Sequence, residues 1–394
     1  MSESRTLILH DGEIADAEGT RRADVAVRDG EIVSVGRGAD AEGDADAYVD
    51  ASGAYVAPGL IDCHVHLVSD GNPDPKGDHR ETDATLAYRA ARAMEDALLS
   101  GITTVRDLNA PGSVAIDAGQ AVEKGVLQGP RVRACGEAIT MTGGHFYQMA
   151  READGPDDCR KAAREQLRRG ADVVKFMACG SILWDEVQAA PELTYEEMRA
   201  IVEAAHAKDV PVAAHAPGTE SMKDAVRAGV DSIEHANFMD EKAARMMADN
   251  DVYWVPTAKA LREFVERGPE EGFDEKYIER ARDTKEAERR TFELAMDHDV
   301  PVAMGTDAGT AFNYHGENAD ELELMVENGM SPADALEAAT ANAADLVGVE
   351  AGRIEEGRHA DLVVLPEDPN EDASAWQEPT AVIKDGEVVH ETQT

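Results

Sequence analysis

The sequence predicts an α/β fold, a (β/α)8 TIM barrel joined to a small β-sandwich domain. Three observations lead to this prediction. Short apolar runs alternate with helix-like segments through the middle of the chain, β-like runs joined by turns fill residues 5–57, and similar β-like runs return near the C-terminus. With 394 residues the chain exceeds the size that one core normally serves, so a large and a small domain are expected.

The two ends of the chain predict the small domain. Segments such as TLILHDGEI and DVAVRDGEIVSVG contain Asp-Gly pairs between β-like runs, a strong signal for hairpins. The closing segment AVIKDGEVV has the same pattern. Residues 1–57 and 358–394 are therefore expected to form one small β-sandwich domain.

The middle of the chain, residues 58–357, predicts the barrel domain. Apolar runs such as GITTVRDL and VPVAMGTD read as buried strands, and LTYEEMRAIVEAAHAKD reads as an amphipathic helix. Strands separated by helices imply a parallel sheet, and about eight such units match a barrel. An open, doubly wound sheet is the main rival, but no GxGxxG follows the first strand. Residues 68–83, rich in Gly, Pro and Asp, predict a loop and a candidate lid.

Charge is the strongest compositional signal. The chain has 38 Lys and Arg against 80 Asp and Glu, a formal net charge of −42. Such a field repels nucleic acid and anionic membranes, so neither is an expected partner. The acids are spread along the chain and not gathered in a tail, a pattern typical of halophilic proteins, in which salt screens the repulsion. An acidic protein without a salt requirement is the alternative.

The compartment is predicted from what the sequence lacks. The four cysteines are scattered without a CxxC pair, which favours a reducing environment. The first residues lack a basic segment followed by an apolar stretch, and no run of 18 apolar residues suggests a membrane span. A cytoplasmic location is therefore expected. The oligomeric state stays open, a homo-oligomer included.

The segment PGLIDCHVHLV carries the first candidate metal ligands. His64 and His66 are two positions apart at the end of an apolar strand, so both imidazoles point to the same face. In a barrel that face is the interior, near the mouth where active sites lie. Two imidazoles so placed suit Zn²⁺ or a similar ion, although an isolated HxH also occurs in ordinary packing.

Further polar residues occur in or at the ends of other predicted strands. Lys175 lies within DVVKFMA, His215 ends VPVAAHA, His235 ends VDSIEHA and Asp307 ends VPVAMGTD. A buried lysine is costly unless it is paired or neutralised. Each residue alone could be a satisfied core group. Their recurrence at separate strand ends predicts a shared metal site.

These residues and their surroundings resemble the amidohydrolase superfamily. The likeness extends over nearly the whole chain and includes APGLIDCHVH, GITTVRD, MGTDAG and the closing GRIEEGRHADLVVL. Within the superfamily, ITMTGGH followed by the lysine strand is most similar to the imidazolonepropionase-related group of prolidase-like enzymes, which includes Xaa-Pro dipeptidases and carboxypeptidases. The resemblance implies the TIM barrel and a metal-dependent hydrolase of C–N bonds.

The resemblance also implies a centre of two divalent metal ions. Its ligands would be His64, His66, Lys175, His215, His235 and Asp307. Lys175 would bridge the two ions as an N6-carboxylated lysine, because an ammonium cannot bind a cation. Zinc is the first expectation, but imidazole and carboxylate ligands also suit Mn²⁺, Co²⁺ and Fe²⁺.

The implied reaction is attack of a metal-bridging hydroxide on an amide or peptide C–N bond. Water between two divalent ions has its pKa lowered toward neutrality, and Asp307 would act as general base and then general acid. The expected substrate is a dipeptide, Xaa-Pro-like, or an N-acyl amino acid. Ring opening or deamination of a cyclic amide or amidine, as in imidazolonepropionase, is the alternative. An inactive scaffold barrel is disfavoured because every implied ligand is present.

Two residues of a glycine-rich loop are candidate substrate-binding groups. His145 and Tyr147 lie in TMTGGHFYQ, after the predicted strand RVRACG. His145 is expected to contact a substrate carbonyl or carboxylate, with Tyr147 nearby. A surface-loop histidine is the competing interpretation. Arg106, in TTVRD, is expected to pair with an acid in the structure.

Overall fold

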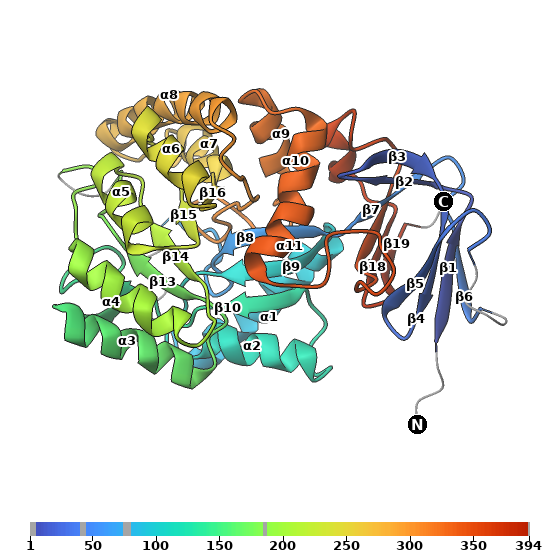
Figure 1. Cartoon of the computed structure of the whole chain (residues 1–394), viewed down its shortest axis with the longest axis horizontal. Helices are drawn as coiled ribbons and strands as arrows, with labels where there is room; N and C mark the ends of the chain where they lie inside the picture. The colour runs from blue at the N-terminus through green and yellow to red at the C-terminus, as the bar shows by residue number, and fades with distance from the viewer. Residues whose placement is uncertain (1–4, 40–44, 74–79, 184–186, 393–394) are drawn as a thin grey trace.

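The computed structural model describes residues 5–39, 45–73, 80–183 and 187–392. Figure 1 shows an α/β body next to a smaller, mostly β region that contains both the first and the last strands of the chain. Part of the predicted loop at 68–83, residues 74–79, lies outside the described residues. Within the described part of the chain, every helix is too short or too polar to cross a membrane.

The smaller region begins with a four-stranded sheet of order β5-β4-β1-β6. Its strands are β1 (Thr6–His10), β4 (Asp24–Arg28), β5 (Glu31–Gly36) and β6 (Ala47–Asp50). The hairpin between β4 and β5 turns through Asp29 (φ 53°) and Gly30 (φ 85°), the left-handed pair that a tight hairpin needs. The Asp-Gly signal in the sequence is thereby confirmed.

A six-stranded sheet of order β19-β18-β17-β7-β2-β3 joins the two ends of the chain. Its strands are β2 (Glu13–Asp16), β3 (Gly19–Arg22), β7 (Tyr55–Pro58), β17 (Leu362–Leu365), β18 (Ala381–Lys384) and β19 (Glu387–Glu391). β7 and β17 pair antiparallel, and one buried apolar cluster contains Leu9 and Val25 from the first sheet with Val56 and Leu362 from this one. The division at residues 57 and 358 into two domains stays a prediction.

The α/β body contains two parallel sheets. One has the order β10-β9-β8 and the other the order β12-β11-β13-β14-β15-β16. The strands are β8 (Leu60–Val65), β9 (Ile102–Asp107), β10 (Arg131–Ala134), β11 (Ile139–Thr140), β12 (Arg151–Glu152), β13 (Val174–Met177), β14 (Val212–His215), β15 (Ser232–Glu234) and β16 (Tyr253–Val255). Because neighbouring strands run parallel, their C-terminal ends lie on the same side of the body.

Helices follow most of these strands and surround them (Figure 1). They are α1 (Asp83–Leu99), α2 (Val114–Glu123), α3 (Pro156–Arg169), α4 (Tyr195–His206), α5 (Thr219–Ala228), α6 (Glu241–Asp249), α7 (Ala258–Arg267), α8 (Glu275–Asp297), α9 (Asp320–Glu327), α10 (Pro332–Ala339) and α11 (Ala341–Val347). The start of α4 illustrates the local cause, because Thr194 and Glu197 form a reciprocal capping box. The predicted alternation of strands and helices is confirmed.

The prediction that the segment VPVAMGTD forms a strand is corrected by the structure. Residues 301–308 form isolated bridges on either side, Trp254 with Val302 and Val65 with Ala308, and not a regular strand. The reason is local. A side chain at Gly305 would collide with Val255, and Asp307 has a left-handed φ of 60°, which no regular strand allows. The segment therefore runs between β16 and β8, and its backbone turns at Asp307.

Candidate active site

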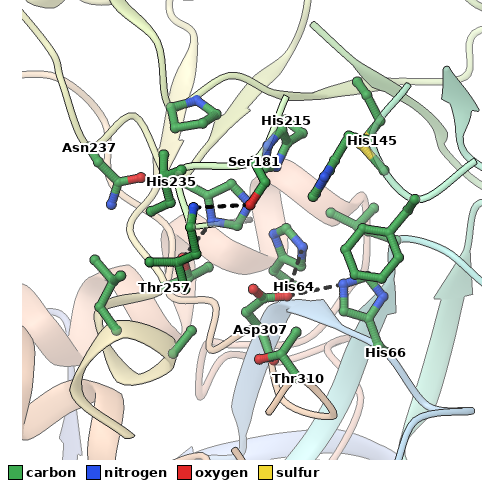
Figure 2. A pocket seen from close by; sticks show the side chains of 18 of the residues that line it. His64, His66, His145, Ser181, His215, His235, Asn237, Thr257, Asp307 and Thr310 are labelled. Atoms are coloured by element: carbon green, nitrogen blue, oxygen red, sulfur yellow. Dashed lines mark hydrogen bonds and ion pairs between the residues drawn. The ribbon is translucent and has the colours of Figure 1, made fainter. Parts of the chain in front are cut away.

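A pocket at the C-terminal ends of the parallel strands contains nearly all the predicted site residues (Figure 2). Those that line it are His64, His66, His145, Lys175, His215, His235 and Asp307. Tyr147 is the exception, because it is absent from the described lining and its side chain is 46% exposed. The prediction of Tyr147 as a substrate-binding group finds no support in this geometry.

His64, His66 and Asp307 form a compact group of possible metal ligands. Their ligand atoms all lie within 4.8 Å of one another. Asp307 Oδ1 is 3.0 Å from His66 Nε2 and 3.4 Å from His64 Nε2. The alternation along β8 and the residue after it turns both imidazoles into the pocket, while Cys63, the residue before His64, packs into a separate apolar cluster. The left-handed backbone at Asp307 aims its carboxylate at the two rings.

His215 and His235 extend this group into a row of imidazoles. Their ring centroids are 4.7 Å apart, and the His235 ring is 5.0 Å from that of His64. On the other side His145 stacks on His215 at 4.5 Å. His235 has a left-handed φ of 70° and its Nδ1 is 2.7 Å from Thr257 Oγ1, so its position is fixed by both backbone and side chain.

Two buried nitrogen atoms in the pocket lack a hydrogen-bond partner in the described structure. They are Nζ of Lys175 and Nε2 of His215. Lys175 is 2% exposed, and burial lowers the pKa of its amine to about 8. Native proteins rarely leave buried polar groups unpaired, because desolvation without a partner costs free energy. Two such nitrogens beside a His-His-Asp group fit a site built to bind cations.

The protonation states of His64, His235 and Asp307 also fit metal binding, whereas the Asp307 carboxylate outweighs burial and raises the pKa of His66. Burial, with the nearby charge of Lys175, lowers the pKa of His64 to about 4, and burial and His64 lower that of His235 to about 3. For Asp307 burial acts to raise the pKa, but the surrounding histidines outweigh it and hold the carboxyl ionised. Neutral imidazoles and an ionised carboxylate are the forms that bind metals.

A buried ion pair supports His64 from behind. Glu234 is fully buried at the end of β15 and accepts hydrogen bonds from His64 Nδ1 at 2.8 Å, Arg106 Nη2 at 2.9 Å and Ser232 Oγ at 2.6 Å. Burial alone would raise the pKa of Glu234, but the charges of Arg106 and Lys175 lower it instead. The predicted structural pairing of Arg106 is confirmed. Glu234 itself was missed, although an acid inside the apolar run VDSIEHA is a signal.

Asp62 holds the segment that carries Asp307. Its carboxylate accepts hydrogen bonds from Thr306 Oγ1 at 2.6 Å and from Asn318 Nδ2 at 2.7 Å, and burial raises its pKa to about 6. The contact ties β8 to residue 306, the neighbour of Asp307. Sequence reasoning missed Asp62 because its partners lie more than 240 residues away.

The remaining pocket wall is largely apolar. Phe146, Leu183, Leu261 and Phe264 contribute to it. None of these was singled out from the sequence, because apolar residues on helices and loops look alike whether they line a core or a pocket.

The comparison with known protein families identifies the class. The amidohydrolase family profile matches residues 55–389. The chain belongs to the amidohydrolase family and is a hydrolase that acts on carbon–nitrogen bonds. Members of this family generally bind divalent metal ions, and the pocket contains a group of candidate ligands.

Three individual relatives indicate the kinds of reaction found among similar proteins. Ochratoxinase of Aspergillus niger is 31% identical over 421 aligned positions, which cover 96% of this chain and 85% of the relative. Imidazolonepropionase of Salinispora tropica is 29% identical, and the alignment covers 88% of this chain and 86% of that relative. The crystal structure of a Xaa-Pro dipeptidase with bound methionine matches with a TM-score of 0.90 and 33% identity, covering 98% of this chain and 100% of that one. These relatives support amide-bond hydrolysis.

Proposed function

We propose that this chain hydrolyses the amide bond of a dipeptide, Xaa-Pro-like, or of an N-acyl amino acid at a centre of two divalent metal ions. The observation that carries the proposal is the buried, partnerless amine of Lys175 in the same pocket as the His64, His66 and Asp307 group. An amine in that place has no structural use as an ammonium, but it suits a bridging ligand once it is carboxylated.

Each ion has its own proposed ligands. His64, His66 and Asp307 would hold one, and His215 and His235 would hold the other. Zinc is the first candidate, with manganese, cobalt and iron as alternatives. When bound, the ions supply an activated water molecule and polarise the substrate carbonyl.

Lys175 would join the two sets of ligands as a carbamate. With its pKa near 8, a fraction of the amine is neutral at neutral pH, and its nitrogen can attack CO₂. A new N–C bond forms, one N–H proton leaves to solvent, and the product is an anion with two oxygen ligands. The nearby positive charge would stabilise that anion.

Asp307 is the proposed proton carrier. Its carboxylate is held ionised by the histidines around it, so it can accept a proton from the attacking water and pass that proton to the leaving nitrogen. His145, stacked on His215 at the pocket wall, would donate a hydrogen bond to the substrate.

We also propose that the parallel strands close into a (β/α)8 barrel. Support comes from backbone hydrogen bonds on both sides of residues 301–304. Trp254 N donates to Pro301 O at 2.8 Å, and Cys63 N donates to Met304 O at 2.9 Å. The segment would thus complete the ring between β16 and β8.

The test is a screen of Xaa-Pro and other dipeptides and N-acyl amino acids on metal-replete enzyme in concentrated salt. Release of a free amino acid is the expected result. Lys175→Ala should lose bound metal together with activity, and Lys161→Ala, an exposed lysine of α3, is the matched control. Unchanged metal content and activity in Lys175→Ala would remove the bridging role.

Because imidazolonepropionase is among the relatives, a second candidate reaction is the opening or deamination of a cyclic amide or amidine. Its products differ from those of peptide hydrolysis. A ring-opened acid or ammonia without release of an amino acid would favour it.

A further inference from the structure

Asn237 is a pocket residue that the proposed chemistry does not yet use. It lies two residues after His235, is 2% exposed, and lines the pocket. Its Nδ2 donates a hydrogen bond to Glu288 Oε1 of α8 at 3.3 Å, while its Oδ1 has no partner in the described structure. In Figure 2 the amide oxygen of Asn237 is turned toward the interior of the pocket. A buried acceptor of this kind is an incomplete interaction.

The orientation of the amide follows from its surroundings. Glu288 is buried, and the hydrogen bond that its Oε1 accepts holds the NH₂ end of Asn237 against α8. The oxygen is left on the pocket side. Because a carboxamide oxygen only accepts hydrogen bonds, the group that completes it must be an N–H or O–H donor.

The other polar groups of the wall are already engaged or of another kind. Thr257 Oγ1 is paired with His235 Nδ1, and Thr310 Oγ1 donates to Asp307 O. Among the described lining residues, Lys175 is the single Lys or Arg. The described wall therefore offers a buried acceptor for a donor group but no arginine to bind a free carboxylate.

We propose that Asn237 binds the free amino group next to the scissile carbonyl, so that the preferred substrate is an aminoacyl compound such as a dipeptide and not an N-acyl amino acid. This inference rests on the proposed function. The amino group of a dipeptide is attached to the carbon beside the scissile carbonyl. With that carbonyl at the His215 and His235 side of the pocket, the amino group would face Asn237, which lines the same pocket two residues after His235.

The experiment compares Asn237→Ala with the unmodified enzyme on a dipeptide and on the N-acyl amino acid that differs from it only by lacking the α-amino group. The unmodified enzyme should prefer the dipeptide. In Asn237→Ala, kcat/KM for the dipeptide should fall about 10-fold or more, mostly through KM, while that for the N-acyl amino acid should change less than about threefold. Asn342→Ala removes a partly buried asparagine outside the pocket and is the matched control.

A binding measurement keeps the inference separate from the proposed function. Calorimetry would use ketomethylene dipeptide isosteres, which cannot be cleaved, with and without the α-amino group. Tighter binding of the amino form, lost in Asn237→Ala, supports the inference even if no peptide is cleaved. Asn237→Gln, which keeps the amide but moves its oxygen, replaces Asn237→Ala if that variant does not fold. Equal binding of the two isosteres, or an equal loss of kcat/KM on both substrates, would overturn the inference.

Discussion

At the scale of single residues, Glu234 links the candidate metal ligands to the core of the protein. It accepts a hydrogen bond from His64 Nδ1, which fixes the tautomer of that ring so that Nε2 faces Asp307. Arg106 and Ser232 hold the same carboxylate from the other side. A contact of this kind raises the basicity of a ligating imidazole and restricts its rotation.

Glu234→Gln tests this role. The substitution keeps the shape but removes the charge, so metal affinity should fall about 10- to 100-fold. Competition with a chelator would measure the change. Glu203→Gln, which removes one charge from an exposed pair with Arg199 on α4, should leave metal affinity unchanged. Full metal affinity in Glu234→Gln would mean that Glu234 only balances the charge of Arg106.

The sequence was informative about single residues wherever strand periodicity carried the information. His64 and His66 share a face because they are two positions apart, and the pocket contains both. Glu234 and Asp62 escaped notice because their roles depend on partners far along the chain. Tyr147 was expected near the site because it lies two positions from His145; it is 46% exposed, and its role in substrate binding stays a prediction.

At the scale of elements, α7 forms one wall of the pocket and is held by α9. Glu321 of α9 accepts hydrogen bonds from the backbone N–H groups of Ala258 and Lys259, each at 2.8 Å. It thus caps the N-terminus of α7 from outside the helix. Thr257, the residue at the cap position, is therefore free to use its hydroxyl on His235.

Glu321 should also make stability depend on pH. Burial raises the pKa of its carboxyl to about 8, against an ordinary value of 4.5, although the backbone hydrogen bonds oppose the shift. The folded state therefore retains a proton that the unfolded chain loses. Its contribution to stability is complete below about pH 4.5, decreases as pH rises, and is lost above about pH 8.

Glu321→Gln removes this titration. The free energy of unfolding of the unmodified protein, minus that of the variant, should fall between about pH 4.5 and pH 8 by up to about 1.4 kcal/mol per pH unit and then level off. Denaturant titrations at several pH values would measure it. A difference that is independent of pH would show that Glu321 is ionised throughout.

A second link between these helices depends on Lys259. Its ammonium is fully buried and lies 2.8 Å from Asp320, 3.2 Å from Glu263 and 3.5 Å from Glu317. These three acids could hold a metal ion by spacing alone, but the ammonium already supplies the positive charge. The cluster is therefore best explained as a structural connection between α7 and α9.

Lys259→Met should destabilise the protein by about 3–5 kcal/mol, because it removes the cation from the buried carboxylate of Glu263 and the partly buried carboxylate of Asp320. Thermal or denaturant unfolding would measure the loss. Lys276→Met, an exposed lysine near the start of α8, is the control and should change stability by less than about 0.5 kcal/mol. Similar stabilities for the two variants would mean that Arg262 and Arg267 suffice for Glu263.

Elements were predictable where local patterns determine them. Short apolar runs predicted β9, β13 and β14, and the Asp-Gly turn predicted the hairpin of β4 and β5. Residues 300–307, VPVAMGTD, were predicted to form a strand because their apolar run is typical of one. Their actual path depends on close packing of Gly305 against β16 and β8, which the sequence of the segment does not reveal.

At the scale of the whole molecule, the excess of acidic residues sets the electrostatic conditions of folding. Eighty acids against 38 Lys and Arg leave 42 carboxylates that no basic side chain of the chain can match one to one. Many of the ion pairs that do form lie on the surface, such as Arg282 with Glu275 and Arg290 with Glu293. Exposed pairs of this kind contribute little stability. The repulsion among the remaining acids is therefore weakened mainly by water and dissolved ions.

Salt should therefore stabilise this protein more than it stabilises a protein with balanced acidic and basic residues. Raising KCl from about 0.1 M to about 1 M shortens the screening length from about 10 Å to about 3 Å, less than the usual spacing of surface carboxylates. The unfolding midpoint should rise over this range, and activity should rise with it. Sucrose, which stabilises folded proteins by exclusion without screening charge, is the control and should have the smaller effect. An unfolding midpoint that does not fall on dialysis into low salt would show that the carboxylates tolerate one another unaided, and the surface would then be acidic without being adapted to salt.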